Sequence, residues 1–535
     1  MLHATRVVPR HTSFARYAAR LAAIAALAIW ASGCGSTAPR TQQAELPAVV
    51  ELTILATNDF HGALEQVDTD RDSQRPIGGA QWLTATIARE HATNPDGILL
   101  LDGGDIYQGT ALSNLTEGRA SIDFMNDAGY DAAAVGNHEF DWGVPVLIQR
   151  IAQAKFPMLV ANMKERATGE LPSWAKPYVV IERKGVRIAV IGLITPDTPN
   201  VTMPENVAPY EFLDPAEVAN RLIPELVPAK ADLAVITTHH GGSMNDDGTL
   251  RGEVVEMSEA IHGESAIIAG HTHQIMHGYA DGVPIVEAGS SGRWLGRIDL
   301  TVDRAARVVT ASDVRVMTVF ADSIAPDSSV AALVARYRAE VAPILDEVIG
   351  EAEIEIDVGR RECGMGNLLA DVTRIASRVS FAFQNPGGVR APIDQGPITY
   401  SEVYRVMPFD NTIVTMDLTG AEVIGLLEEA SGDGGFLHVS GLRYTADMSR
   451  PAGSRVTVIA QSDGTPVVAD TIYPIAVNNF MAQGGDELPI ITNRPGARET
   501  GILIRDALAG YIRHETEEGR KLASRAEGRV QIQGR

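Results

Sequence analysis

At 535 residues, with 45% hydrophobic and 21% charged residues, the chain has the composition of a globular protein and is too long for one hydrophobic core, so we expect two domains. Its 45 Lys and Arg residues against 68 Asp and Glu give a formal net charge of −23, which argues against a nucleic-acid polymer as partner, since such a partner needs a broad basic face. A small anionic substrate remains compatible with this charge, because bound metal ions can reverse the local field.

The first 33 residues are typical of a signal peptide. Four arginines precede the apolar run Leu21 to Trp30, which is about half as long as a membrane-spanning helix requires. Small residues follow and end at Cys34, as in a bacterial lipobox, although Ala31 stands where Leu is usual. We therefore expect an exported protein, periplasmic or on the cell surface, held at the membrane by a lipid on Cys34, with plain secretion as the alternative. Residues 34–48 would form the tether.

The rest of the chain divides into two blocks of different pattern. From Val49 to about residue 325, short β-branched runs alternate with helical patterns, which predicts a layered α/β domain. Apolar residues at helical spacing from Val330 to Val348 predict one long helix over residues 326–350, which would either connect two domains or belong to one domain's core. Residues 351–535 mix strands, helices and Gly-rich turns, which predicts a second α/β domain.

In the first block, each predicted strand ends in residue types that bind metal ions. The five strand ends carry Asp59 and His61, Asp102 and Asp105, Asn137 and His138, His239 and His240, and His271 and His273. Such side chains should converge, because the functional crevice of an open α/β sheet lies at the carboxyl ends of its strands. Carboxylate, amide and imidazole ligands together suit divalent ions such as Zn, Mn, Co or Fe.

A pair of such ions requires one bridging carboxylate. We expect Asp102 to be this bridge, since it stands at the end of a central strand, and we expect Asp105 not to be a ligand. At the strand end that carries two adjacent histidines, either His239 or His240 could be a ligand.

The motifs TNDFHG, LDGGDIYQG, VGNHEFDWG, TTHHGG and AGHTH, in this order, resemble the metallophosphoesterase domain of the bacterial and animal 5′-nucleotidase family. The resemblance implies a four-layer α/β sandwich over residues 49–325, a linker helix over 326–350 and a C-terminal α/β nucleotide-binding domain over 351–535. It also implies two divalent ions, Zn, Mn or Co, one held by Asp59, His61, Asp102 and His273 and the other by Asp102, Asn137, His239 and His271. His138 would then be catalytic, with Asp141 as its orienting partner.

The resemblance continues through RRECGMGNLLAD, NPGGVR, MPFDN and NNFMAQGGDEL. It implies that the C-terminal domain binds the nucleoside, with substrate contacts from Asn385, Arg390, Phe409, Phe480 and Asp486, and from Arg360 through a one-residue shift. Two aromatic rings can stack a base, an Arg fork fits anionic oxygens, and a carboxylate fits the ribose hydroxyls. The chain departs from the family at Gly364, Pro386 and Glu487, where many relatives have Asn, Gly and Gly.

The resemblance therefore predicts hydrolysis of nucleoside 5′-monophosphates, with nucleotide sugars and diphosphates as further candidate substrates. The alternatives are a thiosulfohydrolase of sulfur oxidation on the same fold and a 2′,3′-cyclic nucleotide phosphodiesterase; a non-catalytic nucleotide- or metal-binding surface protein is the least favoured. No obligate protein partner is evident from the sequence.

Overall fold

The computed structural model describes residues 47–65, 67–70, 72–359, 361–431 and 436–534. The expected signal peptide, Cys34 and Arg360 lie outside these described residues. The compact unit runs from Ala48 to Arg535. Within the described part of the chain, no helix has both the length and the apolar character that crossing a membrane requires.

The N-terminal part is built on two six-stranded sheets. The first has the order β18 (Val308–Thr318), β17 (Trp294–Asp303), β1 (Val49–Thr57), β4 (Ile98–Asp102), β5 (Ala132–Ala134), β6 (Met158–Leu159). The second has the order β15 (Ile275–Ala280), β16 (Val283–Ala288), β14 (Ala266–Ile268), β11 (Leu233–His239), β9 (Val186–Ile194), β8 (Tyr178–Arg183). In each sheet four neighbouring strands are parallel, β1-β4-β5-β6 and β16-β14-β11-β9, and the flanking strands are antiparallel.

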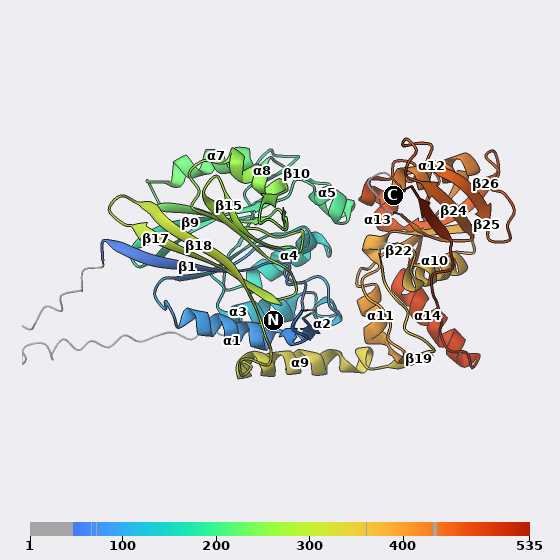
Figure 1. Ribbon diagram of the computed structural model, residues 1–535, viewed down its shortest axis with the longest axis horizontal. Helices are drawn as coiled ribbons and strands as arrows, with labels where there is room; N and C mark the ends of the chain where they lie inside the picture. The colour runs from blue at the N-terminus through green and yellow to red at the C-terminus, as the bar shows by residue number, and fades with distance from the viewer. Residues whose placement is uncertain (1–46, 66, 71, 360, 432–435, 535) are drawn as a thin grey trace, which may run out of the picture. The chain divides into compact units, whose positions relative to one another are not determined.

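These two sheets face each other, and helices cover their outer faces. The inner core takes Leu52 and Ile54 of β1 together with Val190 of β9, while Leu55 points to the opposite side of β1. That outer side packs against α1 (Ala80–His91), α3 (Arg119–Ala128) and α4 (Val144–Gln153), and the second sheet packs against α7 (Pro215–Leu226) and α8 (Glu253–Ala260). Figure 1 shows α7 and α8 on the other side of the sheets from α1 and α3. The expected four layers are therefore confirmed.

The long helix predicted at residues 326–350 is α9 (Ser328–Leu345). Asp327 caps it by accepting hydrogen bonds from the backbone N–H groups of Ser329 and Val330. Its apolar stripe is buried in the core that α1 and α3 share, so α9 belongs to the N-terminal core as well as leading to the next part of the chain. Val348 is 61% exposed and begins β19 (Val348–Ala352), which ends the helical pattern.

The C-terminal part has a five-stranded sheet between two clusters of apolar side chains. Its order is β23 (His438–Ser440), β20 (Phe381–Gln384), β26 (Ile472–Asn478), β22 (Thr412–Thr419), β27 (Arg498–Leu503). One cluster includes α10 (Gly364–Ser377), α11 (Tyr400–Val406) and α14 (Ile504–Glu517); the other includes α12 (Gly420–Ala430) and α13 (Asn479–Gln483). A three-stranded sheet has the order β25 (Val456–Gln461), β24 (Leu442–Asp447), β28 (Val530–Gln533), and β19 pairs with β21 (Gly396–Thr399).

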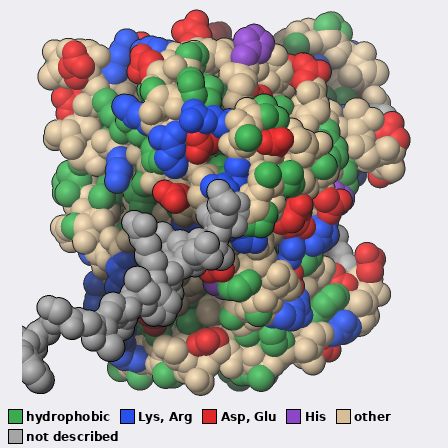
Figure 2. All heavy atoms as spheres, turned by 90° about the vertical axis from the view of Figure 1, so that its left-hand side faces the viewer, with side chains coloured by type: hydrophobic (Ala, Val, Ile, Leu, Met, Phe, Trp, Pro, Cys, Tyr) green, Lys and Arg blue, Asp and Glu red, His purple; other side chains and the backbone are tan. Residues whose placement is uncertain are grey.

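Acidic and basic side chains are interspersed on the face of the molecule that Figure 2 shows. The described residues on that face form no extended basic stripe of the kind that tracks a nucleic-acid backbone.

Gly364, where many relatives of the resembled family have Asn, begins α10 in a confined place. A Cβ atom at this position would lie 2.6 Å from the carbonyl oxygen of Ser524, which is closer than real Cβ contacts come. In this chain the segment around Ser524 therefore occupies the space that a side chain at position 364 would need.

Candidate metal centre

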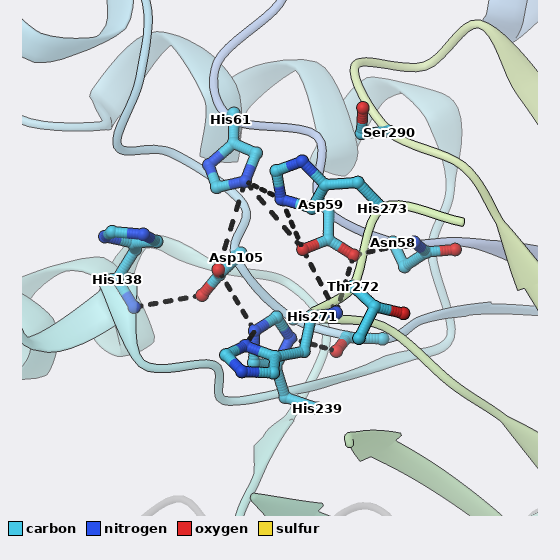
Figure 3. A network of polar contacts seen from close by, with 12 residues as sticks. Asn58, Asp59, His61, Asp105, His138, His239, His271, Thr272, His273 and Ser290 are labelled. Atoms are coloured by element: carbon cyan, nitrogen blue, oxygen red, sulfur yellow. Dashed lines mark hydrogen bonds and ion pairs between the residues drawn. The ribbon is translucent and has the colours of Figure 1, made fainter. Parts of the chain in front are cut away.

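The metal-binding residue types lie where five parallel strands from both sheets end. β1 leads into Asp59 and His61, β11 ends at His239, and β14 leads into His271 and His273. Figure 3 shows these side chains pointing toward one another from separate loops. The sequence prediction that the strand ends converge is consistent with this geometry.

One cluster is formed by Asp59, His61 and His273. The Nε2 atoms of His61 and His273 lie 3.0 Å apart, and Nε2 of His273 lies 3.3 Å from Oδ1 of Asp59. The same Asp59 oxygen lies 3.8 Å from Nε2 of His61.

The second cluster adjoins the first through Asp59 and is formed with Asp105 and His239. Nε2 of His239 lies 3.0 Å from Oδ2 of Asp105 and 3.3 Å from Nδ1 of His271. That Nδ1 atom lies 3.1 Å from Oδ1 of Asn137. These side chains thus present nitrogen and oxygen atoms to one small volume.

These distances fit divalent cations. Ligand atoms at about 2.0–2.2 Å from an ion such as Zn²⁺ lie about 3 to 3.6 Å from one another, which matches most of the distances in both clusters. Two imidazole nitrogens 3.0 Å apart, as in His61 and His273, need either a shared proton or a common cation. The donor set of carboxylate, amide oxygen and imidazole suits a borderline to hard cation.

Second contacts of the histidines fix which nitrogen faces the cluster. Nδ1 of His61 donates to the carbonyl of Gln108 at 2.8 Å, and Nδ1 of His239 donates to the carbonyl of Gly103 at 2.9 Å. Each Nε2 atom thereby faces the cluster. Burial, together with the neighbouring His273, lowers the pKa of His61 to about 3, so His61 is neutral, as a ligand must be.

Asp105, which is not expected from the sequence to be a ligand, belongs to the second cluster and faces His61 of the first. Its Oδ2 atom is 3.0 Å from Nε2 of His239 and 3.9 Å from Nε2 of His61. Burial alone would raise the pKa of Asp105, but His239 and His138 outweigh burial and hold the pKa well below its usual value. Asp105 is therefore ionised and placed as a bridging carboxylate would be.

Asp102 occupies a different environment, so the prediction that it bridges the ions does not match the geometry. Its carboxylate accepts hydrogen bonds from Oγ1 of Thr57 at 2.6 Å and from the backbone N–H of Gly104 at 2.9 Å. It belongs to neither cluster in the described part of the chain. Burial raises the pKa of Asp102 to about 8. We conclude that Asp102 supports the loop that carries Asp105.

Five residues in and beside the clusters have left-handed backbone conformations that side chains other than glycine rarely adopt. The φ angles are 48° for Asp59, 50° for His61, 58° for Asp105, 82° for His271 and 58° for His273. Such conformations cost roughly 1–3 kcal/mol each and are concentrated at functional sites.

The buried Glu139 holds the loop that carries Asp105. Its carboxylate accepts hydrogen bonds from the N–H groups of Gly136 at 2.7 Å, of Asp105 at 2.8 Å and of Ile106 at 2.8 Å. Glu139 therefore braces a neighbouring loop as well as its own.

A second buried glutamate, Glu287, holds the loop between His271 and His273. It accepts a hydrogen bond from the Thr272 hydroxyl at 2.9 Å and another from the N–H of Gln274 at 3.0 Å. This residue is not among those predicted from the sequence. The signal that could have revealed it was an acidic residue inside the apolar run PIVEAG.

His138 lies beside the clusters without belonging to either of the two groups found among the described residues. Its Nδ1 atom lies 2.7 Å from Oδ2 of Asp141, whose other oxygen accepts from the Thr202 hydroxyl at 2.7 Å. Its backbone N–H donates to Oδ1 of Asp105 at 2.9 Å. Burial would lower the pKa of His138, but Asp141 and Asp105 outweigh burial and raise the pKa to about 9. Asp141 and Asp105 therefore favour the protonated form of the imidazole.

A cavity of about 590 Å³ extends from this pair, and we call it the His138 cavity. It is lined by His138 and Asp141 and also by five of the predicted substrate residues, Asn385, Arg390, Phe409, Phe480 and Asp486. A second cavity of about 640 Å³ reaches His61 and His273 and shares Arg390 and Phe409 with the first.

Contacts within the His138 cavity place its polar and aromatic groups. Nδ2 of Asn385 donates to Oδ2 of Asp486 at 2.6 Å. The Arg390 guanidinium lies 5.8 Å from the centroid of the Phe409 ring, and that centroid is 6.0 Å from the centroid of the His138 ring. The aromatic wall is therefore continuous with the His138 imidazole.

Comparisons with known proteins agree with the two-part organisation. Residues 52–275 match the calcineurin-like phosphoesterase family, and residues 348–493 match the 5′-nucleotidase C-terminal domain. Protein UshA of Salmonella pullorum is 30% identical over 538 residues, which cover 92% of this chain and 96% of UshA. Endonuclease YhcR of Bacillus subtilis is 30% identical over 512 residues, 90% of this chain, but the alignment spans only 41% of that protein. The 5′-nucleotidase precursor of Thermus thermophilus has a similar structure, with a TM-score of 0.79 and 30% identity over 91% of this chain and 100% of its own.

Proposed function

The chain belongs to the 5′-nucleotidase family and is a metal-dependent phosphoester hydrolase, and from that premise we propose that it releases phosphate from nucleoside 5′-monophosphates outside the cytoplasm with the help of two divalent ions. The observation that carries the proposal is the His138 cavity, because the same space is lined by His138 and Asp141 and by Phe409 and Phe480. The cavity therefore places the proposed catalytic pair in the same space as aromatic side chains that can stack a base.

For the ions, the geometry supports Asp59, His61, Asp105 and His273 around one, and Asp105, Asn137, His239 and His271 around the other. The chemistry that such ions supply when bound is the activation of water and the neutralisation of phosphoryl oxygens. Zn, Mn and Co all suit this set of donors.

His138 would act on the substrate. When Nδ1–H of His138 donates its hydrogen bond to Asp141, the Nε2–H group of the protonated ring points away from that carboxylate. From there it can stabilise the charge that develops on a phosphoryl oxygen or give a proton to the leaving ribose oxygen.

The C-terminal residues would select the nucleotide. Phe409 and Phe480 offer rings for stacking the base, the Asp486 carboxylate fits the ribose hydroxyls, and the Arg390 fork fits phosphate.

The proposed location rests on the sequence before residue 49. We propose export by a signal peptide and attachment through lipid on Cys34. Replacing Cys34→Ser should move the protein from the membrane fraction to the soluble exported fraction, and an unchanged distribution would contradict the anchor.

A phosphate-release panel tests the activity. Mature protein is treated with chelator, reloaded with Mn, Zn or Co, and given AMP, a nucleotide sugar, a 2′,3′-cyclic nucleotide and ribose 5-phosphate, with sulfate release from a thiosulfonate carrier measured in parallel. We expect metal-dependent phosphate release, fastest from AMP. Metal-loaded protein that releases no phosphate from any nucleotide would refute the proposal, and sulfate release instead would indicate the thiosulfohydrolase.

A further inference from the structure

A separate polar cavity lies in the C-terminal part of the chain. Its volume is about 230 Å³, and it shares no lining residue with the His138 cavity of about 590 Å³ or with the metal clusters. Its polar wall comes from α10, β23, β24 and the segment that leads into β28: Asp371, Arg374, Ser440, Arg443, Glu527 and Arg529.

Both acidic residues of this wall are already paired with one arginine. Arg529 holds Asp371 through two hydrogen bonds of 2.7 and 2.8 Å, and its Nε atom donates to Glu527 at 3.0 Å. The Arg529 side chain is only 16% exposed. Arg529 and its two acidic partners form a fixed part of the wall. Among the described residues, neither acid of the wall forms an ion pair with the other two arginines, Arg374 and Arg443.

Arg374 is held in place by a fully buried serine. Its Nε atom donates to Oγ of Ser440 at 2.7 Å, and the Ser440 hydroxyl donates to Asp371 at 2.5 Å. In the described part of the chain, the two terminal amino groups of Arg374 have no hydrogen-bond partner. Because Nε and the serine are fixed, the position of the guanidinium is set in advance of any ligand.

Arg443 completes the wall from β24. Its hydrogen bond in the described structure is a contact of 3.3 Å from Nη2 to the carbonyl of Ser462. Three arginines thus face two acids, and the cavity keeps a net positive charge in a chain whose formal net charge is −23. This local excess of positive charge favours an anionic ligand, which would bind between Arg374 and Arg443.

We propose that this cavity is a second anion site and that it binds a phosphate-type oxyanion. Guanidinium groups match such an anion because their N–H donors pair with two oxygens at once. The anion could come from free inorganic phosphate or from the phosphate group of a nucleotide. The site requires no hydrolysis, so phosphate binding at this cavity can be measured whether or not AMP is a substrate.

The test is equilibrium dialysis of the full-length, metal-loaded protein against labelled inorganic phosphate. We expect two sites per chain in the unaltered protein. Arg374→Gln combined with Arg443→Gln should weaken one of them at least about tenfold, because charge-assisted hydrogen bonds are lost, while kcat and KM for AMP stay unchanged. The matched control combines Arg513→Gln and Arg520→Gln, which removes the same charge from exposed ion pairs elsewhere and should keep both sites.

Repeating the measurement with Arg390→Gln, which removes the proposed phosphate contact of Arg390, reduces the contribution of the first site to the signal. A phosphonate analogue of AMP that cannot be hydrolysed is then added as competitor. Displacement of phosphate assigns the site to nucleotide phosphates as well as to free phosphate, and no displacement assigns it to free phosphate. The proposal is overturned if the Arg374/Arg443 variant binds as much phosphate as the unaltered chain, or if the control variant loses the same site.

Discussion

Nδ1 of His138 lies 2.7 Å from Oδ2 of Asp141, and the backbone N–H of His138 donates to Asp105 at 2.9 Å. His138 is thus tied to Asp141, which lines the His138 cavity, and to Asp105, which belongs to the second metal cluster. The pairing with Asp141 orients the imidazole, and the link to Asp105 fixes its distance from the metal clusters.

Replacing His138→Ala should leave metal binding intact and abolish most of the turnover. The side chain lies outside the metal clusters, and loss of a general acid or charge stabiliser typically lowers kcat by about 10²–10⁴-fold. Metal content by mass spectrometry and phosphate release from AMP check this together. Asp141→Asn, which keeps the ring but weakens its orientation, should lose less. Equal loss of metal in the His138 variant would refute the division of roles.

Asp105→Asn and Asp102→Asn separate the two candidate bridging residues. Asp105 faces His239 and His61, whereas Asp102 accepts from Thr57 and Gly104. We expect Asp105→Asn to lose metal and activity, because a neutral amide is a poor bridge between two cations. Asp102→Asn should keep its metal and lose about 1–3 kcal/mol of stability through impaired hydrogen bonds. Metal retained by the first variant and lost by the second would restore the assignment of Asp102 as the bridge.

Phe409→Ala should weaken the binding of the base without touching the metals. Stacking on an aromatic side chain contributes about 1–3 kcal/mol per base, so kcat/KM for AMP should fall about 5- to 150-fold. Ribose 5-phosphate lacks the base and serves as the matched substrate, for which the variant and the unaltered protein should differ little. A similar fall for both substrates would show that the ring positions His138 instead of binding the base.

The fold class and most of the candidate site could be predicted because apolar strands followed directly by Asp, Asn or His leave a clear pattern in the sequence. The difference between the predicted and the observed position of Asp102 has a physical cause. The last residue of β4 points toward Thr57 of the neighbouring strand, and the chain then turns through left-handed conformations at Gly104 (φ 94°) and Asp105 (φ 58°). That turn directs Asp105 into the centre, and residue spacing alone does not show it. Glu287 was missed for a related reason, since its partner loop is brought to it only by the tertiary fold.

His438 should make the C-terminal part less stable in mild acid. It is 1% exposed, and within the described residues its Nε2 atom has no hydrogen-bond partner. Burial, only partly opposed by Glu362, lowers its pKa to about 4 from the ordinary value of 6.5. Between these values the unfolded chain binds the proton and the folded chain does not. The free energy of unfolding should therefore fall as the pH drops from about 6.5 toward 4, by up to about 1.4 kcal/mol per pH unit.

Denaturant unfolding of chelated protein at pH 7 and pH 5 measures this effect, with His438→Leu as the comparison. Leucine cannot take up a proton, so the variant should lose less stability between the two pH values than the unaltered chain, by about 2 kcal/mol. In the chelated state, the metal-binding residues titrate in the same way in both proteins. Their contribution to the pH dependence therefore cancels when the two proteins are compared. Parallel pH profiles for the two proteins would show that the folded chain protonates His438 as readily as the unfolded chain does, which contradicts the prediction.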